Sequence, residues 1–139
     1  MDKSGYRILL VDDETDTLEF ISYNLKKEGY EIHQSLNGKD AVVRAGEILP
    51  HLILLDVMMP EMDGLETCRE LRKNPGLDRS AIVFLTARGD HSRSEGYKAG
   101  ADYYMTKPIS PEVLINRINA ILAGRDKPSV DQDDLSSTV

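Results

Sequence analysis

The chain has 139 residues and a formal net charge of −7, and its 40% hydrophobic and 29% charged residues are typical of one globular domain with its own core. No apolar run approaches the ~18 residues that a membrane span needs, and the first apolar run is too short for a signal peptide, so neither is expected. The acidic balance argues against this chain alone binding nucleic-acid phosphates, and a single cysteine, Cys68, excludes an internal disulfide and favours the reducing cytoplasm.

Hydrophobic periodicity divides the chain into strands and helices that alternate along its length. In chain order, we predict a strand at residues 6–11, a helix at 15–28, a strand at 30–36, a helix from 38 through 48, a strand at 51–55, a helix at 64–73, a strand at 81–85, a helix at 90–99, a strand at 102–105 and a last helix from 111 that ends before 124. Gly29 follows one helix, Pro50 stops another, and Ser110 caps the start of the last. The helix at 90–99 is the weakest by propensity, with Gly96 in its middle.

Five strands alternating with five helices predict an α/β fold: a single, doubly wound parallel sheet with helices on both faces. Its central strands are expected to be apolar throughout, because helices cover both of their faces. The runs at residues 8–11, 52–55 and 81–85 fit this expectation. The more polar strand at 30–36 is expected at an edge of the sheet.

Charged and hydroxyl side chains stand at the carboxyl ends of four predicted strands. They are Asp12 and Asp13 after the first strand, Asp56 after the third, Thr86 after the fourth and Lys107 near the end of the fifth. In an open parallel sheet these ends lie on one side, where ligands bind at the point of strand-order reversal. Crowded carboxylates raise one another's pKa unless a cation lies among them, and Lys107 supplies one positive charge. Mg²⁺, a hard divalent ion, complements the remaining oxygen ligands.

These residues indicate phosphoryl transfer. An isolated charge is costly in a buried strand, so the Asp56 carboxylate is expected to emerge at the sheet edge and to accept a phosphoryl group as a nucleophile. The transfer needs in-line positioning and neutralisation of the phosphoryl oxygens. Mg²⁺ on Asp12 and Asp13 would hold one oxygen. The Lys107 ammonium and the Thr86 hydroxyl would hold the others.

Four motifs, in this order and spacing, resemble those of response-regulator receiver domains in two-component signalling. They are Leu-Val-Asp-Asp-Glu, Leu-Leu-Asp-Val-Met-Met-Pro-Glu-Met-Asp-Gly, Leu-Thr-Ala-Arg and Tyr-Tyr-Met-Thr-Lys-Pro. The resemblance covers residue 6 to about residue 123 and implies a flavodoxin-like strand order, 2-1-3-4-5. It also implies a signalling switch that is phosphorylated by a histidine kinase or a phosphotransfer protein, and that catalyses only its own phosphorylation and dephosphorylation.

The resemblance assigns roles to individual residues. The implied phosphoacceptor is Asp56. The implied Mg²⁺ site consists of Asp12, Asp13, Asp56 and the Met58 backbone carbonyl. The groups implied to sense the phosphoryl group are Lys107 and Thr86. Asp12 is implied to act mostly through water. Tyr104 matches the aromatic switch position, whose ring turns into space that the Thr86 hydroxyl vacates. The Lys107–Pro108 bond matches a peptide bond that is cis in the family.

Three other functions stay open at this point. An aspartyl-nucleophile phosphatase needs a second acid two residues after the nucleophile, where Met58 stands. A flavodoxin-like mononucleotide binder needs a Gly/Ser/Thr-rich first loop, where Asp12, Asp13 and Glu14 would repel phosphate. A receiver-like interaction module that is not phosphorylated is expected to lack one of the acids or the lysine.

Residues 1–124 are expected to form the receiver domain, and the acidic residues 125–139 a flexible tail or linker. The Leu-Thr-Ala-Arg-Gly run and the fifth-strand region resemble receivers of winged-helix transcription factors. No DNA-binding module follows, so we expect either a single-domain regulator or a fragment of a longer one. The fourth helix, fifth strand and fifth helix are the expected output face, whose mixed charge at Lys98, Asp102 and Arg117 favours a symmetric homodimer on phosphorylation.

Overall fold

The computed structural model describes residues 3–89 and 92–124, and the predicted tail at 125–139 lies outside them. The strands are β1 (Arg7–Val11), β2 (Glu31–Ser35), β3 (Leu52–Leu55), β4 (Ala81–Thr86) and β5 (Tyr103–Thr106). The helices are α1 (Thr15–Lys27), α2 (Gly38–Ile48), α3 (Gly64–Arg72), α4 (Arg93–Lys98) and α5 (Pro111–Ala123), with a short 3-10 helix, η1 (Pro75–Leu77), after α3. Each predicted strand and helix is present, and most ends lie within one or two residues of the prediction.

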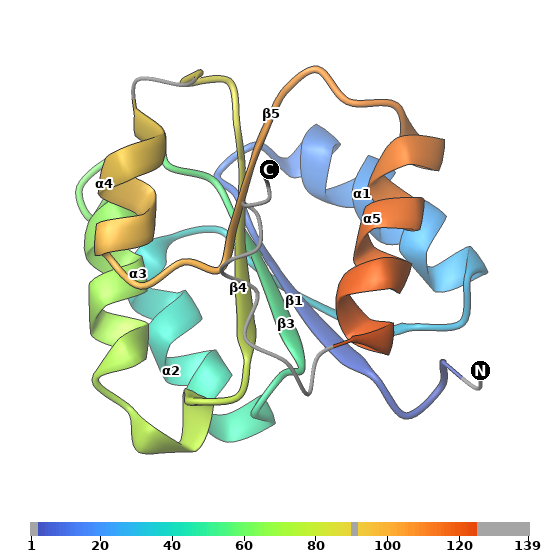
Figure 1. The fold of residues 1–139 in the computed structure, drawn as a ribbon, viewed down its shortest axis with the longest axis horizontal. Coiled ribbons are helices and arrows are strands. Elements are labelled where there is room, and N and C mark those ends of the chain that lie inside the picture. Colours follow the sequence, from blue (N-terminus) through green and yellow to red (C-terminus); the bar gives the residue numbers. More distant parts are fainter. Residues whose placement is uncertain (1–2, 90–91, 125–139) are drawn as a thin grey trace.

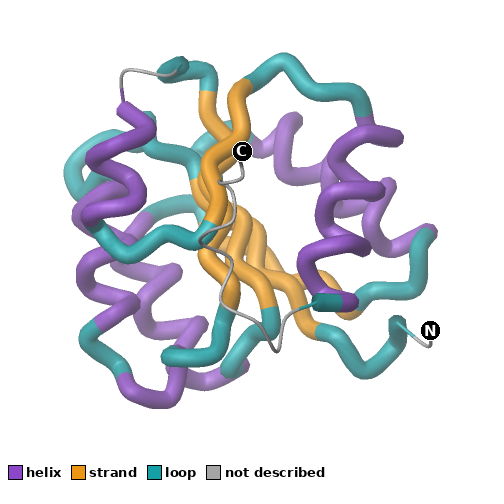
Figure 2. Tube along the Cα trace, in the orientation of Figure 1, coloured by secondary structure: helices purple, strands orange, loops and turns teal. Residues whose placement is uncertain are grey.

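All five strands run parallel in one sheet, in the order β2-β1-β3-β4-β5, which confirms the predicted fold and strand order. Helices α1 and α5 cover one face of the sheet, and α2, α3 and α4 cover the other (Figure 1; Figure 2). The strand order reverses between β1 and β3, because the chain moves from β1 outward to β2 and then returns to β3 on the other side of β1. Within residues 3–89 and 92–124, no helix has the length and apolar character needed to span a membrane.

Two hydrophobic cores lie on the two faces of the sheet, because successive strand residues point to opposite sides. Leu9 and Ile53 belong to the core under α2 and α3, whereas Ile8 and Leu54 belong to the core under α1 and α5. Strand β3 is buried along its whole length, as predicted for a central strand covered on both faces. Strand β2 is partly exposed and lies at the edge, as predicted.

Local hydrogen bonds explain where three helices begin. The side chains of Asn37, Asp63 and Ser110 accept hydrogen bonds from backbone N–H groups in the first turns of α2, α3 and α5. The Ser110 cap confirms the predicted start of the last helix. Gly29, with a φ of 104°, follows α1 in the left-handed conformation that glycine adopts without strain.

The fourth helix is shorter than predicted. Helix α4 contains six residues, whereas the pattern predicts a helix from residue 90, and residues 90 and 91 lie outside the described part of the chain. It begins without a side-chain cap, and its residues have low helix propensity. Gly96 nevertheless packs closely on the sheet, because a Cβ there would lie 3.0 Å from Tyr104 Cδ2 and 3.2 Å from Phe84 Cδ2.

Candidate functional site

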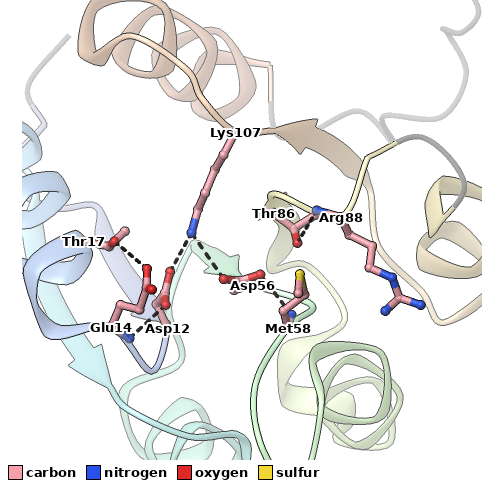
Figure 3. A network of polar contacts seen from close by, with 8 residues as sticks. All are labelled: Asp12, Glu14, Thr17, Asp56, Met58, Thr86, Arg88 and Lys107. Atoms are coloured by element: carbon pink, nitrogen blue, oxygen red, sulfur yellow. Dashed lines mark hydrogen bonds and ion pairs between the residues drawn. The ribbon is translucent and has the colours of Figure 1, made fainter.

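Four strands bring the predicted polar residues together at the side of the sheet where their carboxyl ends lie (Figure 3). These residues are Asp12 after β1, Asp56 after β3, Thr86 at the end of β4 and Lys107 after β5. Strands β1 and β3 flank the point where the strand order reverses, which is where ligands bind in open parallel sheets. The structure therefore places these four residues where the sequence predicts a ligand site.

Lys107 bridges two buried carboxylates. Its Nζ donates hydrogen bonds to Asp12 Oδ2 at 3.0 Å and to Asp56 Oδ2 at 3.2 Å. Asp12 and Asp56 are only 5% and 7% exposed, so water screens these charges poorly. Two carboxylates and one ammonium leave a net negative charge, which a further cation would neutralise.

Burial and pairing shift the pKa values of Asp12 and Lys107. Burial raises the pKa of Asp12 above its ordinary value, although the hydrogen bond from the Glu14 backbone N–H and the neighbouring Lys107 oppose the shift. Burial alone would lower the pKa of Lys107, but its hydrogen bonds and charge attraction with Asp12 and Asp56 outweigh burial, so that pKa is also raised. Lys107 is therefore a firmly protonated cation, and the negative charge of Asp12 calls for additional positive charge.

The loop after β3 fixes the Asp56 carboxylate. Its Oδ1 accepts a hydrogen bond from the Met58 backbone N–H at 3.0 Å, while Lys107 holds Oδ2. The loop folds back on the strand, because the Gly64 N–H donates to the Val57 carbonyl at 2.9 Å. Only glycine fits at position 64, since a Cβ there would lie 2.1 Å from the Asp56 carbonyl oxygen. The start of α3 and the predicted phosphoacceptor are thus in direct backbone contact.

Thr86 lies beside Asp56 on the side away from Asp12 in the view of Figure 3. It is fully buried, and its Oγ1 accepts a hydrogen bond from the Arg88 backbone N–H at 3.2 Å. Its carbonyl accepts a hydrogen bond from the Lys107 N–H at 2.8 Å, which ties the two strand ends together. The peptide bond that follows Lys107, to Pro108, is cis, as the resemblance implied.

The oxygen donors at this edge fit Mg²⁺. Asp12 and Asp56 are buried beside one another, whereas Asp13 is exposed. Among residues 3–89 and 92–124, no three acidic, histidine or cysteine side chains converge as a metal site by themselves. Mg²⁺ does not require such a cage, because proteins bind it through one or two carboxylates while it keeps several waters. The excess negative charge around Lys107 is consistent with such an ion.

Tyr104, at the predicted switch position, lies with its side chain in the interior and is 3% exposed. Its hydroxyl donates a hydrogen bond to the Gly89 carbonyl at 3.0 Å, and its ring packs against Phe84 with centroids 5.8 Å apart. Arg93, which the sequence does not single out, donates to the Tyr104 carbonyl at 3.0 Å. No periodicity or motif marks Arg93, because its partner lies eleven residues away on another element.

Asp102, predicted to contribute charge to the output face, is partly buried, with 27% of its side chain exposed, and its carboxylate is bound within the domain. Its Oδ2 accepts hydrogen bonds from the Ile82 N–H and from the Arg72 guanidinium, both at 2.9 Å. Arg72 also donates to the carbonyls of Gly100 and Leu77 at 2.9 Å. This network fastens the loop between α4 and β5 to α3 and β4.

The chain matches the model of a known protein family. The model of the response regulator receiver domain matches residues 8–119. The phosphate regulon transcriptional regulatory protein PhoB of Rhizobium meliloti is 43% identical over 125 residues, which cover 89% of this chain and 55% of PhoB. The transcriptional regulatory protein SrrA of Staphylococcus aureus is 38% identical over 128 residues, which cover 91% of this chain and 52% of SrrA. The chain therefore spans about half the length of the curated relatives it matches.

Solved structures share the fold. The chemotaxis protein CheY4 of Vibrio cholerae matches with a TM-score of 0.80 and 28% identity, covering 84% of this chain and 98% of that chain. DrrB of Thermotoga maritima, described as an OmpR/PhoB homolog, matches with a TM-score of 0.75 and 33% identity, covering 88% of this chain and 54% of that chain. These findings confirm the resemblance to receivers of transcription regulators.

Proposed function

This chain belongs to the response regulator receiver domain family, and we propose that it is a phosphorylation-dependent signalling switch in which Asp56 accepts a phosphoryl group. The proposed donor is the phosphohistidine of a histidine kinase or of a phosphotransfer protein. One observation carries the proposal: the buried Asp56 carboxylate shares the Lys107 ammonium with a second buried carboxylate, Asp12, at the ligand-binding edge of the sheet.

In the proposed reaction, a carboxylate oxygen of Asp56 attacks the phosphorus in line with the leaving group. The bond between phosphorus and the donor nitrogen breaks, and its electron pair stays on the imidazole. The Met58 N–H and Lys107 orient the carboxylate, each through one of its oxygens. The Lys107 ammonium then faces the incoming phosphoryl oxygens and neutralises part of their charge.

Thr86 is the proposed sensor of the phosphoryl group. Its oxygen accepts the Arg88 N–H, so the hydroxyl proton stays available to donate to a phosphoryl oxygen on Asp56. A hydrogen bond to a charged acceptor contributes about 1.5–3 kcal/mol. Turning of the Thr86 hydroxyl toward that acceptor would alter the loop before α4, which is how chemistry at Asp56 would reach the output face.

Mg²⁺ is the proposed cofactor, held by Asp12, Asp13, Asp56 and the Met58 backbone carbonyl. When bound, the ion neutralises charge between the carboxylates and the phosphoryl group. Asp12 would act mostly through water. The raised pKa of Asp12 supports the need for a cation here, because burial disfavours its charge more than Lys107 and the Glu14 N–H restore it.

The proposed signalling partners follow from the same function. Phosphorylation would favour a homodimer through α4, β5 and α5, where Tyr97 and Val113 are 42% and 48% exposed. Asp102, one of the charged residues predicted on this face, is already paired with Arg72 of the same chain. The proposed location is the cytoplasm, and neither membrane association nor direct DNA binding by this chain is part of the proposal. An aspartyl phosphatase has no support, since Met58 occupies the position of its second acid.

Phosphorylation by acetyl phosphate tests the proposal. With Mg²⁺, intact mass should increase by one phosphoryl group, and EDTA should prevent the increase. Asp56→Asn should abolish it, whereas Asp63→Asn should not, because asparagine also caps α3 and residue 63 lies outside the cluster around Lys107. Label on Asp56→Asn would refute the assignment, and full labelling in EDTA would refute the metal's role.

A further inference from the structure

Contacts from three segments enclose the Tyr104 ring. Phe84, its register partner on β4, packs beside it, with ring centroids 5.8 Å apart. Gly96 of α4 lies directly against it, since a Cβ there would be 3.0 Å from a ring carbon. The Tyr104 hydroxyl donates to the Gly89 carbonyl in the loop before α4, at 3.0 Å. The ring therefore occupies a site shaped for it, and α4 forms one wall of that site.

Arg93, the first residue of α4, covers the ring. Its guanidinium carbon lies 5.2 Å from the ring centroid, within the ~6 Å of a cation–π contact. Its NH1 also donates to the Tyr104 backbone carbonyl at 3.0 Å. Arg93 thus binds both the main chain and the side chain of one residue on β5. A planar guanidinium can stack and donate at once, which the compact ammonium of lysine cannot do.

The Tyr104 and Thr86 hydroxyls bind the same short loop. Thr86 accepts from the Arg88 N–H at 3.2 Å, and Tyr104 donates to the adjacent Gly89 carbonyl at 3.0 Å. A movement of Thr86 toward a phosphoryl group on Asp56 therefore changes the loop that Tyr104 also holds. The adjacent backbone groups of Arg88 and Gly89 therefore link the Thr86 hydroxyl to the Tyr104 hydroxyl.

We infer that Arg93 is a positioning residue, which holds the Tyr104 ring in the interior and thereby favours the loop arrangement that accepts the phosphoryl group. The inference rests on the proposed function, because it concerns the response of the same site. Coupling between two sites is reciprocal. A contact that stabilises the interior ring therefore strengthens binding of the phosphoryl group, and an occupied site in turn holds the ring inside.

Binding of beryllofluoride with Mg²⁺, a phosphoryl mimic, measures this coupling. Arg93→Gln should weaken its binding about fivefold, at the lower end of typical coupling between sites. Arg69→Gln makes the same change of side chain at an exposed position of α3 and should leave binding unchanged. Arg93→Lys should give an intermediate loss. Equal losses in Arg69→Gln and Arg93→Gln, or unchanged binding in Arg93→Gln, would overturn the inference.

A double-mutant cycle identifies the Tyr104 ring as the partner of Arg93. The effect of Arg93→Gln should persist in Tyr104→Phe, which keeps the ring, and should shrink in Tyr104→Leu, which keeps only the backbone carbonyl. An equally large effect in Tyr104→Leu would contradict the role of the ring. Thermal melting without the mimic identifies any variant that has lost its fold, and Arg93→Lys then replaces Arg93→Gln in the cycle.

Tyrosine nitration reports the ring directly, and its comparison of the wild type with Arg93→Gln does not need the mimic. Tyr104 should be protected in the wild type, nitrated faster in Arg93→Gln and protected again once beryllofluoride is bound. Tyr23, 63% exposed on α1, serves as the internal standard. Unchanged protection of Tyr104 in Arg93→Gln would refute the inference. Failure of the wild type to bind the mimic would instead refute the proposed function, so the two failures are distinguishable.

Discussion

Replacement of Gly64 by alanine is expected to damage both stability and phosphorylation. Gly64 begins α3, and its N–H donates to the Val57 carbonyl at 2.9 Å. A Cβ at this position would lie 2.1 Å from the Asp56 carbonyl oxygen, 2.7 Å from Val57 Cα and 2.8 Å from the Asp56 carbonyl carbon. All three are main-chain atoms, so no side chain can rotate away to relieve the collision.

The size of the effect follows from these distances. Non-bonded carbon contacts are optimal at about 3.5–4.0 Å, so the start of α3 must move away from Asp56 by about 1 Å. Overpacking costs about 1–3 kcal/mol, and weakening of the Gly64–Val57 hydrogen bond adds about 1 kcal/mol. We therefore expect Gly64→Ala to lower the free energy of unfolding by about 3 kcal/mol. A 1 Å displacement of reacting groups slows chemistry about 10²-fold, so labelling by acetyl phosphate should nearly disappear.

Urea denaturation and intact-mass labelling measure the two effects. Gly46→Ala is the matched control, because a Cβ there meets only Asn74 Nδ2 at 3.4 Å, an ordinary contact. In the last turn of α2, this change should stabilise the domain by about 0.5 kcal/mol and leave labelling unchanged. If Gly64→Ala were as stable and as readily labelled as the wild type, the close packing of α3 on the Asp56 backbone would be wrong.

Two further predictions concern residues outside the site. Burial raises the pKa of Cys68 to about 12, so the native thiol should resist thiol reagents at pH 8. The pKa of the Cys68 thiol is higher in the folded chain than in the unfolded chain, so burial of the neutral thiol stabilises the fold below about pH 9, and this stabilisation is lost toward pH 12. Cys68→Ala should therefore lose less stability against urea than the wild type over that range. Identical pH profiles for the two proteins would contradict this. Arg72→Ala should lower the free energy of unfolding by about 2–3 kcal/mol, since Asp102 loses its cationic partner and the carbonyls of Gly100 and Leu77 lose a donor. Lys73→Ala breaks an exposed pair with Glu70 and should change that free energy by less than about 0.5 kcal/mol. Equal effects of the two changes would be inconsistent with the Arg72 network.

The location of the site could be predicted because it follows from topology. Asp12, Asp56, Thr86 and Lys107 are far apart in the sequence, but each stands at the carboxyl end of a strand. Parallel strands of one sheet present those ends at the same edge, so recognition of the strands was sufficient to bring the four side chains together. The continuous apolar runs made the central strands recognisable, since both of their faces are buried.

Contacts made by long side chains could not be predicted in this way. The sequence predicts Asp102 on the output face, but nothing in it predicts the pairing of its carboxylate with Arg72, which is 30 residues away. Arg93 reaches across to Tyr104 from another element. Such contacts depend on rotamers and loop geometry, which leave no periodic signal. Gly64 marks a turn in the sequence, but only the structure reveals that its missing Cβ makes room for the Asp56 backbone.

Chemical location of the phosphoryl group tests the central claim most directly. After treatment with acetyl phosphate and Mg²⁺, borohydride reduces an aspartyl phosphate to homoserine, which peptide mass spectrometry then assigns to a position. We predict homoserine at Asp56 and unmodified aspartate at Asp12 and Asp13. Homoserine at Asp12 or Asp13, with Asp56 intact, would contradict the claim that the carboxylate at the end of β3 accepts the phosphoryl group.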